Sequence, residues 1–174
     1  GMGLVGKTLG IVGCGRIGEE IASRAITFGL KVAYHNRRPK DLPYSYHSSI
    51  AHLAEASDIL LCILPGGEGT KNAINADILK KLGPTGIFIN VGRGSSVDEV
   101  ALASALHAGG IFAAGLDVYA DEPNVPEELL ELDNVVLLPH IGSATVETRR
   151  AMGQLVIDNL DAYFSGRPLI TQVN

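Results

Sequence analysis

Short apolar runs alternate with stretches of helical periodicity along most of the chain. Six of these runs are typical of buried parallel strands, which are covered on both faces and therefore carry nearly continuous apolar residues. Segments with apolar residues three and four positions apart separate the runs, as amphipathic helices require. The expected strands are residues 9–13, 31–35, 58–64, 86–91, 111–118 and 134–139.

The expected helices fall between these strands and after the last one. They are residues 17–28, 49–56, 75–82, 97–108 and 145 to about 165, the last with an apolar face. Repeated alternation of strand and helix predicts an α/β fold with a doubly wound parallel sheet. Such sheets bind ligands in a crevice at the carboxyl ends of their strands, so we expect the chemistry to collect there.

Composition supports a folded, acidic protein. The 174 residues are 46% hydrophobic, and the mean hydropathy of +0.21 is sufficient for one domain with a substantial core. The net charge is −5, the isoelectric point is near 5.5, and no long basic run occurs. These values argue against a nucleic-acid or membrane surface and favour a small-molecule ligand.

The two cysteines, Cys14 and Cys62, lie in apolar surroundings. This placement favours reduced thiols in a cytoplasmic protein over a secreted disulfide framework. Neither has metal-ligand spacing, so we expect no metal. Gly, Pro or charged residues interrupt the apolar runs well short of a membrane span.

A glycine motif follows the first expected strand in "GIVGCGRIG". The G-x-G-x-x-G spacing allows a tight turn, close approach of backbone to a pyrophosphate, and packing of helix on strand. The positive end of the following helix would face the phosphates. The motif predicts a Rossmann-type nucleotide site, although Arg16 could equally be a solvated surface residue. The expected contacts are Gly13, Gly15, Arg16, Ile17 and Gly18.

The second expected strand ends in "YHNRRPK", where NAD-binding chains usually carry an acidic residue. A carboxylate there binds both ribose hydroxyls and repels a 2′-phosphate, whereas Asn36 removes that repulsion. Arg37 and Arg38 can clamp a phosphate through charge-assisted hydrogen bonds. We therefore predict NADP as the cofactor, with NAD possible if this is only a solvated basic loop.

Three further motifs each follow an expected strand. "GRGSS" places Arg93, "ADEPNVP" places Glu122 and "LLPHIGS" places His140. A protonated imidazole can deliver a proton to a carbonyl oxygen as hydride arrives, and a carboxylate behind it stabilises that form and fixes its tautomer. A guanidinium can hold the substrate carboxylate and polarise the carbonyl. The set predicts reduction of a 2-keto acid.

With these motifs, the chain resembles the cofactor domain of the D-isomer-specific 2-hydroxyacid dehydrogenases. The likeness runs from "GKTLGIVGCGRIG" to "GRPLITQVN", and within the family it is most similar to glyoxylate and hydroxypyruvate reductases. The resemblance implies that Arg93 binds the substrate, Glu122 is the carboxylate partner and His140 is the acid/base. It also implies four further cofactor contacts, namely Leu64, Pro65, Val91 and Asp117. Asp117 could instead cap a loop.

The resemblance also has consequences for domain organisation. It implies that residues 3–174 form an NAD(P)-binding domain and that the substrate-binding lobe is absent, apart from a possible C-terminal return segment. Such a chain would bind cofactor but reduce keto acids poorly. Members of this family commonly pair through this domain, which implies a homodimer. Two alternatives stay open: phosphoglycerate dehydrogenase, and a non-catalytic, corepressor-like sensor of the cofactor.

Overall fold

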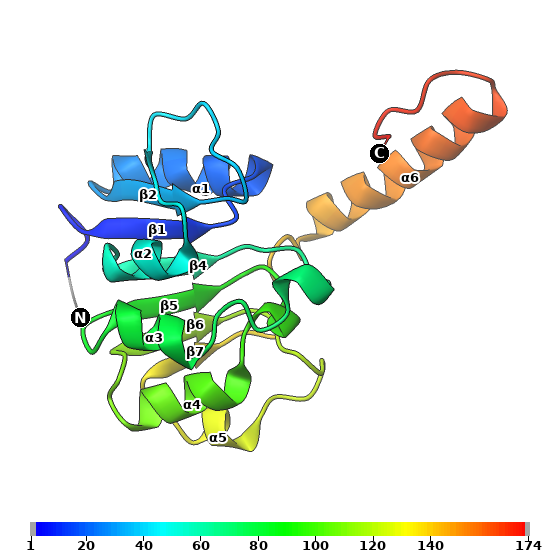
Figure 1. Ribbon diagram of the computed structural model, residues 1–174. Helices are drawn as coiled ribbons and strands as arrows, with labels where there is room; N and C mark the ends of the chain where they lie inside the picture. Colours follow the sequence, from blue (N-terminus) through cyan, green and yellow to red (C-terminus); the bar gives the residue numbers. More distant parts are fainter. Residues whose placement is uncertain (1–2, 173–174) are drawn as a thin grey trace. The chain divides into compact units, whose positions relative to one another are not determined.

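The computed structural model describes residues 3–172 and divides into two compact units, Gly1–Pro139 and His140–Asn174. The first unit is a seven-stranded sheet in the order β3-β2-β1-β4-β5-β6-β7 (Figure 1). Every neighbouring pair of strands is parallel. The doubly wound α/β fold is thereby confirmed. The final two residues of the domain expected at 3–174 lie outside the described residues.

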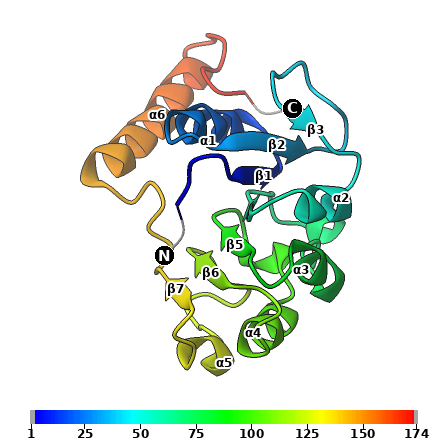
Figure 2. The same cartoon turned by 90° about the vertical axis from the view of Figure 1, so that its left-hand side faces the viewer.

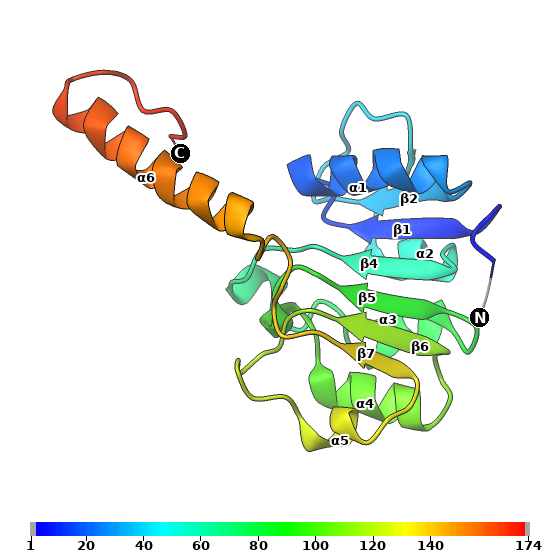
Figure 3. The same cartoon turned by 180° about the vertical axis from the view of Figure 1, so that it is seen from behind.

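The strands of this sheet are short, and neighbouring strands pair over consecutive residues. The order from β2 to β7 is also visible from behind in Figure 3. Strand order reverses between β1 and β4, which are direct neighbours with Val12 opposite Cys62. The bounds are β1 Thr8–Val12, β2 Lys31–His35, β3 Ser45–Tyr46, β4 Ile59–Cys62, β5 Ile87–Asn90, β6 Ala113–Leu116 and β7 Val135–Leu137.

Helices of the first unit lie on both faces of this sheet. Seen nearly along the strands in Figure 2, α1 covers one face and α2, α3 and α4 cover the other. A four-residue helix, α5, precedes β7. The bounds are α1 Arg16–Thr27, α2 Ile50–Glu55, α3 Ala76–Leu82, α4 Glu99–His107 and α5 Glu127–Leu130, with 3-10 turns η1 Glu68–Thr70 and η2 Gly94–Ser96.

Two hydrophobic clusters form the core, one on each side of the sheet. Successive strand residues point to opposite faces, so Ile11 joins the cluster beneath α1 while its neighbour Val12 joins the other. Leu60 and Leu61 divide in the same way on β4. This two-sided burial explains why the strands read as continuous apolar runs in the sequence.

All six expected strands are present, but the structure adds two elements that the pattern did not predict. β3 has only two residues, both exposed, and it extends the sheet beyond β2. α5 has four residues, of which only Leu129 is buried. Elements this short have no measurable periodicity, so the hydrophobic pattern could not reveal them.

The second unit contains α6, Val146–Phe164, as the pattern of residues 145–165 predicts. The hydroxyl of Thr145 accepts a hydrogen bond from the backbone N–H of Thr148 and caps the helix. Asn159 holds the segment that follows α6, because its Oδ1 accepts from Ile170 N (3.0 Å) and Thr171 N (3.2 Å). Among residues 3–172, no helix has both the length and the apolar composition that crossing a membrane requires.

Candidate cofactor site

A cleft of about 960 Å³ opens in the first unit where the loops after β1, β2 and β4 meet. It lies at the carboxyl ends of the strands and at the point where the strand order reverses, as expected for a ligand site in this fold. Seven expected cofactor residues line it. They are Gly13, Gly15, Asn36, Arg37, Arg38, Leu64 and Pro65.

The glycine loop turns sharply from β1 into α1. Gly13 has φ +95°, a left-handed conformation that favours glycine, and a Cβ atom there would lie 3.1 Å from the carbonyl oxygen of Ile63. Gly18 is buried in the first turn of α1, where helix and strand pack closely. Arg16 and Ile17 are exposed beside it. The turn therefore has the geometry that the glycine spacing predicts.

The N-terminus of α1 differs from those of the other longer helices. Side chains of Ser49, Asn75, Asp98 and Thr145 accept hydrogen bonds from the first turns of α2, α3, α4 and α6. α1 begins after Gly15, which has no side chain to make such a bond. The first-turn N–H groups of α1 thus lack a side-chain cap, and a phosphate group bound in the cleft fits this donor set.

The loop after β2 brings positive charge to the same cleft. Arg37 and Arg38 are exposed and line it, with Asn36 at the end of the strand. The amide Nδ2 of Asn36 donates to the carbonyl oxygen of Cys14 (3.1 Å), and the hydroxyl of Tyr46 donates to the carbonyl oxygen of Asn36 (3.3 Å). The loop is therefore tied to the glycine loop, and a neutral amide stands where NAD-binding chains usually carry a carboxylate, with two arginines directly after it.

The third side of the cleft is the loop after β4, which supplies Leu64 and Pro65. The hydroxyl of Thr70 stabilises the conformation of this loop. Its oxygen lies 2.7 Å from the carbonyl oxygen of Pro65 and 3.0 Å from that of Gly67. Gly66, Gly67 and Thr70 also line the cleft. Backbone and small side chains thus form this part of the cleft lining.

Arg93 follows β5 on a loop that buried polar groups hold in place. Its carbonyl oxygen accepts hydrogen bonds from Asn90 Nδ2 (3.1 Å) and Ser96 Oγ (2.6 Å), and both of these side chains are buried. The guanidinium is exposed, and its Nη1 donates to the carbonyl oxygen of Gly92 (2.7 Å). The backbone of Arg93 is therefore fixed while its side chain is exposed.

Glu122 lies on the loop after β6, next to the loop of Arg93. The two loops touch at Gly94, where a Cβ atom would lie 1.8 Å from the backbone carbon of Tyr119, so only glycine fits. Glu122 Oε1 accepts a hydrogen bond from Tyr119 N (3.0 Å). Glu99 Oε1 accepts one from Ala120 N (2.9 Å), and burial raises the pKa of Glu99. The carboxylates of Glu122 and Glu99 therefore hold the backbone at Tyr119 and Ala120.

Five expected residues lie elsewhere. Arg16, Ile17, Gly18, Val91 and Asp117 do not line the described part of the cleft. Val91 is half-exposed at the end of β5, and Asp117 is buried, with its backbone N–H donating to Asn90 O (3.1 Å). His140 belongs to the second unit, and its φ of +53° is in the left-handed region. Whether it meets Arg93 and Glu122 stays a prediction.

The structure also shows cleft residues that the sequence pattern did not single out. His35 and Lys40 line the cleft beside the arginines, and Glu19 forms an ion pair with Lys40. Lys40 ends the basic run "RRPK", so its charge was a usable signal. Glu19 carried no such signal, because it lies on the helix α1 and no sequence pattern connects it with the loop of Lys40.

Both cysteines are buried free thiols, and burial raises the pKa of each.

Comparison with known proteins decides the family. Residues 1–142 match the model of the D-isomer specific 2-hydroxyacid dehydrogenase, NAD binding domain. The chain belongs to this dehydrogenase family. A hydroxyphenylpyruvate reductase of Plectranthus scutellarioides is 50% identical over 169 residues, covering 97% of this chain and 54% of the relative. A glyoxylate/hydroxypyruvate reductase of Arabidopsis thaliana is 49% identical with the same coverage.

Solved structures of this dehydrogenase family share the fold closely. An NADPH-dependent glyoxylate/hydroxypyruvate reductase of Sinorhizobium meliloti, in complex with NADP and malonate, has a TM-score of 0.94 and 54% sequence identity. The match covers 97% of this chain and 53% of that one. The chain therefore spans about half the length of the relatives that it matches.

Proposed function

We propose that the chain is the cofactor-binding part of an NADPH-preferring reductase that converts a 2-keto acid, such as glyoxylate or hydroxypyruvate, into a D-2-hydroxy acid. One observation carries the proposal. Asn36, Arg37 and Arg38 line the cleft next to the uncapped N-terminus of α1. The S. meliloti relative, which is named NADPH-dependent and was solved with NADP, supports the same cofactor.

The charge distribution of the cleft favours the 2′-phosphate. The phosphates that link the two nucleotides would meet the N–H groups at the start of α1. A 2′-phosphate would meet the guanidinium groups of Arg37 and Arg38, which can bind it through two parallel hydrogen bonds each. NADH lacks that phosphate, so the arginines would contribute little to its affinity.

The catalytic roles that we propose divide among three side chains. Bound NADPH would supply a hydride to the carbonyl carbon of the keto acid. Arg93 would bind the substrate carboxylate through its exposed guanidinium. His140 would donate a proton to the carbonyl oxygen, and Glu122 would stabilise the protonated imidazole. The left-handed backbone of His140 costs of the order of 1 kcal/mol, which favours a role for its side chain.

Cofactor preference is tested by titration calorimetry with NADPH and NADH. We expect NADPH to bind about ten- to a hundredfold more tightly than NADH, because a charge-assisted hydrogen bond to a phosphate typically changes a dissociation constant by about that factor. Arg37→Ala should remove most of this preference. Arg167→Ala is the matched control, because it removes the same charge from the second unit, where Arg167 pairs with Asp161. Equal affinities in the unmodified chain would contradict an NADP role.

Catalysis is tested in a chimera, because the chain corresponds to only 53% of the S. meliloti reductase. The corresponding half of that enzyme is replaced by this chain, and NADPH oxidation with glyoxylate or hydroxypyruvate is followed. His140→Ala should lower turnover at least about a hundredfold and leave NADPH affinity unchanged. A chimera that binds NADPH and shows no turnover would favour the non-catalytic alternative.

A further inference from the structure

Lys40 is held at both its backbone and its side chain, unlike an ordinary surface lysine. The hydroxyl of Tyr34, whose residue is only 1% exposed, donates to the carbonyl oxygen of Lys40 (2.9 Å). The hydroxyl oxygen of Tyr34 in turn accepts a hydrogen bond from the backbone N–H of Lys40 (3.0 Å). One buried hydroxyl therefore fixes the backbone of this residue on both sides.

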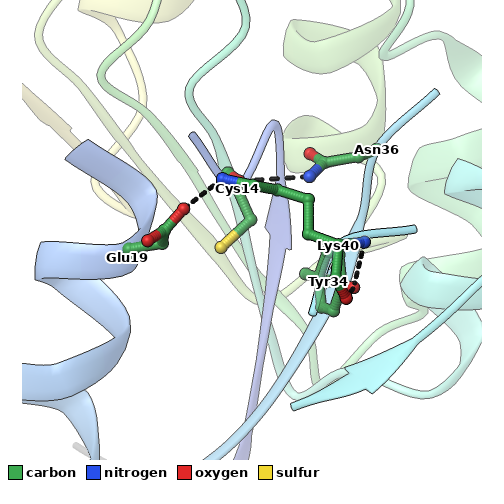
Figure 4. A network of polar contacts seen from close by, with 5 residues as sticks. All are labelled: Cys14, Glu19, Tyr34, Asn36 and Lys40. Atoms are coloured by element: carbon green, nitrogen blue, oxygen red, sulfur yellow. Dashed lines mark hydrogen bonds and ion pairs between the residues drawn. The ribbon is translucent and has the colours of Figure 1, made fainter. Parts of the chain in front are cut away.

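The ammonium group of Lys40 is also held by contacts with other residues. Nζ forms an ion pair with Glu19, and it lies 3.5 Å from the carbonyl oxygen of Cys14 (Figure 4). The amide of Asn36 donates to that same carbonyl oxygen. The ammonium of Lys40 and the amide of Asn36 thus meet at one atom of the glycine loop, and both residues line the cleft.

We propose that Lys40 is a third cation of the 2′-phosphate site and a residue that determines cofactor specificity, which rests on the NADP function proposed above. Asn36 occupies the position that distinguishes a ribose hydroxyl from a ribose phosphate. An ammonium that shares a hydrogen-bond acceptor with Asn36 lies within reach of the same ribose substituent. Lysine has three N–H donors, and the bonds to Glu19 and Cys14 leave one for a phosphate oxygen.

Glu19 positions Lys40 and balances its charge. Glu19 lies in the first turn of α1, next to the end of the helix that would face the cofactor phosphates. Alone, its carboxylate would repel those phosphates, and the ion pair with Lys40 offsets this repulsion. The hydrogen bond to Glu19 also raises the pKa of Lys40, so the ammonium keeps its charge. Arg37 and Arg38 bring two cations from the loop, and Lys40 adds one anchored to α1.

The test measures the dissociation constants of NADPH and NADH for the chain and two variants. Lys40→Met removes the charge and keeps most of the aliphatic stem, so we expect NADPH affinity to fall about tenfold, as for one lost charge-assisted hydrogen bond. NADH affinity should change less than about twofold, because NADH has no phosphate at this position. Lys40→Arg keeps the charge and should retain most of the preference for NADPH.

Arg24→Met is the matched control for a general effect of charge. Arg24 also pairs with a glutamate of α1, Glu20, but it does not line the described part of the cleft. Its removal should leave both affinities unchanged. If Lys40→Met weakens NADPH and NADH equally, Lys40 only supports the loop, and the proposal is overturned. If neither affinity changes, the ion pair has no role in binding, and the proposal is equally overturned.

The two proposals fail in different ways. If the unmodified chain binds NADPH and NADH equally, the NADP function fails, and the role of Lys40 fails with it. If the chain prefers NADPH, Arg37→Ala removes the preference and Lys40→Met preserves it, only the role of Lys40 fails. Parallel titrations of the three proteins under one salt condition separate these results.

Discussion

At the scale of the single residue, Asn90 shows how a buried amide fixes the loop that carries Arg93. Its Oδ1 accepts from Gly92 N (3.1 Å), its Nδ2 donates to Arg93 O (3.1 Å), and it is 1% exposed. The two ends of the amide thus bind two successive residues of the same loop, Gly92 and Arg93. A side chain of similar volume without polar atoms would leave a buried N–H group without its partner.

We expect Asn90→Leu to lower the free energy of unfolding by about 1–3 kcal/mol, the cost of leaving a buried donor unpaired. Urea denaturation of the chain measures this. Asn75→Ala provides a reference, since it removes an exposed helix cap and should cost about 1 kcal/mol. An Asn90→Leu variant as stable as the unmodified chain would show that the loop does not depend on this amide.

Asp58 gives the chain a pH-dependent contact at the base of β1. Its carboxylate accepts from Lys7 Nζ (2.8 Å) and Thr8 N (2.8 Å), and the hydrogen bond from Lys7 is the main cause that lowers its pKa. A lowered carboxyl pKa adds stability above about pH 4, the unfolded value. That stability is lost as the pH falls through the lowered value of the folded state.

Asp58→Asn should therefore destabilise the chain at pH 7, by about 1 kcal/mol. The difference from the unmodified chain should shrink as the pH falls below about 4, because the unmodified carboxylate then gains a proton. Denaturation midpoints at several pH values test this. The control Glu55→Gln removes an exposed ion pair with Lys81 and should have little effect at any pH. A constant difference down to pH 2 would contradict the assignment.

At the scale of the element, α1 begins without the side-chain cap that α2, α3, α4 and α6 have. A capping side chain typically stabilises a helix by about 1 kcal/mol, and α1 lacks one. A lack of space at Gly15 does not explain the missing cap. A Cβ atom at Gly15 would meet no heavy atom within 4 Å in the described chain, and φ is −93°. The missing cap is therefore consistent with a site kept open for phosphate.

Gly15→Asp should stabilise the chain without cofactor by up to about 1 kcal/mol and weaken NADPH binding more than about tenfold. The new carboxylate would cap the free N–H groups and repel the phosphates. Gly15→Ala serves as the control, because it adds a Cβ atom without a cap or a charge. Denaturation and titration are measured on all three proteins. Unchanged NADPH affinity in Gly15→Asp would show that the phosphates bind elsewhere.

At the scale of the whole molecule, the cleft residues all come from one stretch of the first unit, between Gly13 and Ala73. This stretch begins directly after β1 and includes β2 and β4, and these three strands surround the point where the order reverses. Ligand binding to the folded state alone stabilises a protein in proportion to the logarithm of ligand concentration. The effect of NADPH should therefore be strongest in this part of the first unit.

We expect NADPH at a hundred times its dissociation constant to stabilise the chain by about 2.7 kcal/mol. For a chain of this size, the melting temperature should rise by about 5–10 °C. Hydrogen exchange should show the largest gain in protection between residues 13 and 73. The control is the Gly15→Asp variant at the same NADPH concentration, which should be stabilised by no more than about 1.4 kcal/mol if its affinity falls at least tenfold. Protection gained mainly in β6 or β7 would place the cofactor at another part of the sheet.

The sequence by itself determined the fold class and the position of the glycine loop. Strand periodicity is local, and near-continuous apolar runs separated by amphipathic helices require parallel strands covered on both faces, so the six longer strands could be predicted while the two-residue β3 could not. The left-handed Gly13 and the buried Gly18 follow from glycine spacing alone. The sequence also identified Asn36, Arg37 and Arg38 as cleft residues, because their position after the second strand fixes which edge of the sheet they reach.

Only the tertiary structure decided which groups meet in the cleft. The parallel pairing of β1 with β2 brings Cys14, Glu19 and Lys40 together, although Lys40 is 26 residues from Cys14 in the chain. No periodicity reports a contact between a helix turn and a distant loop. Likewise, Asn90 lies within the expected strand 86–91, and only the tertiary structure shows that its buried amide holds the loop of Arg93. Local patterns specify elements, whereas contacts distant in sequence depend on how those elements pack.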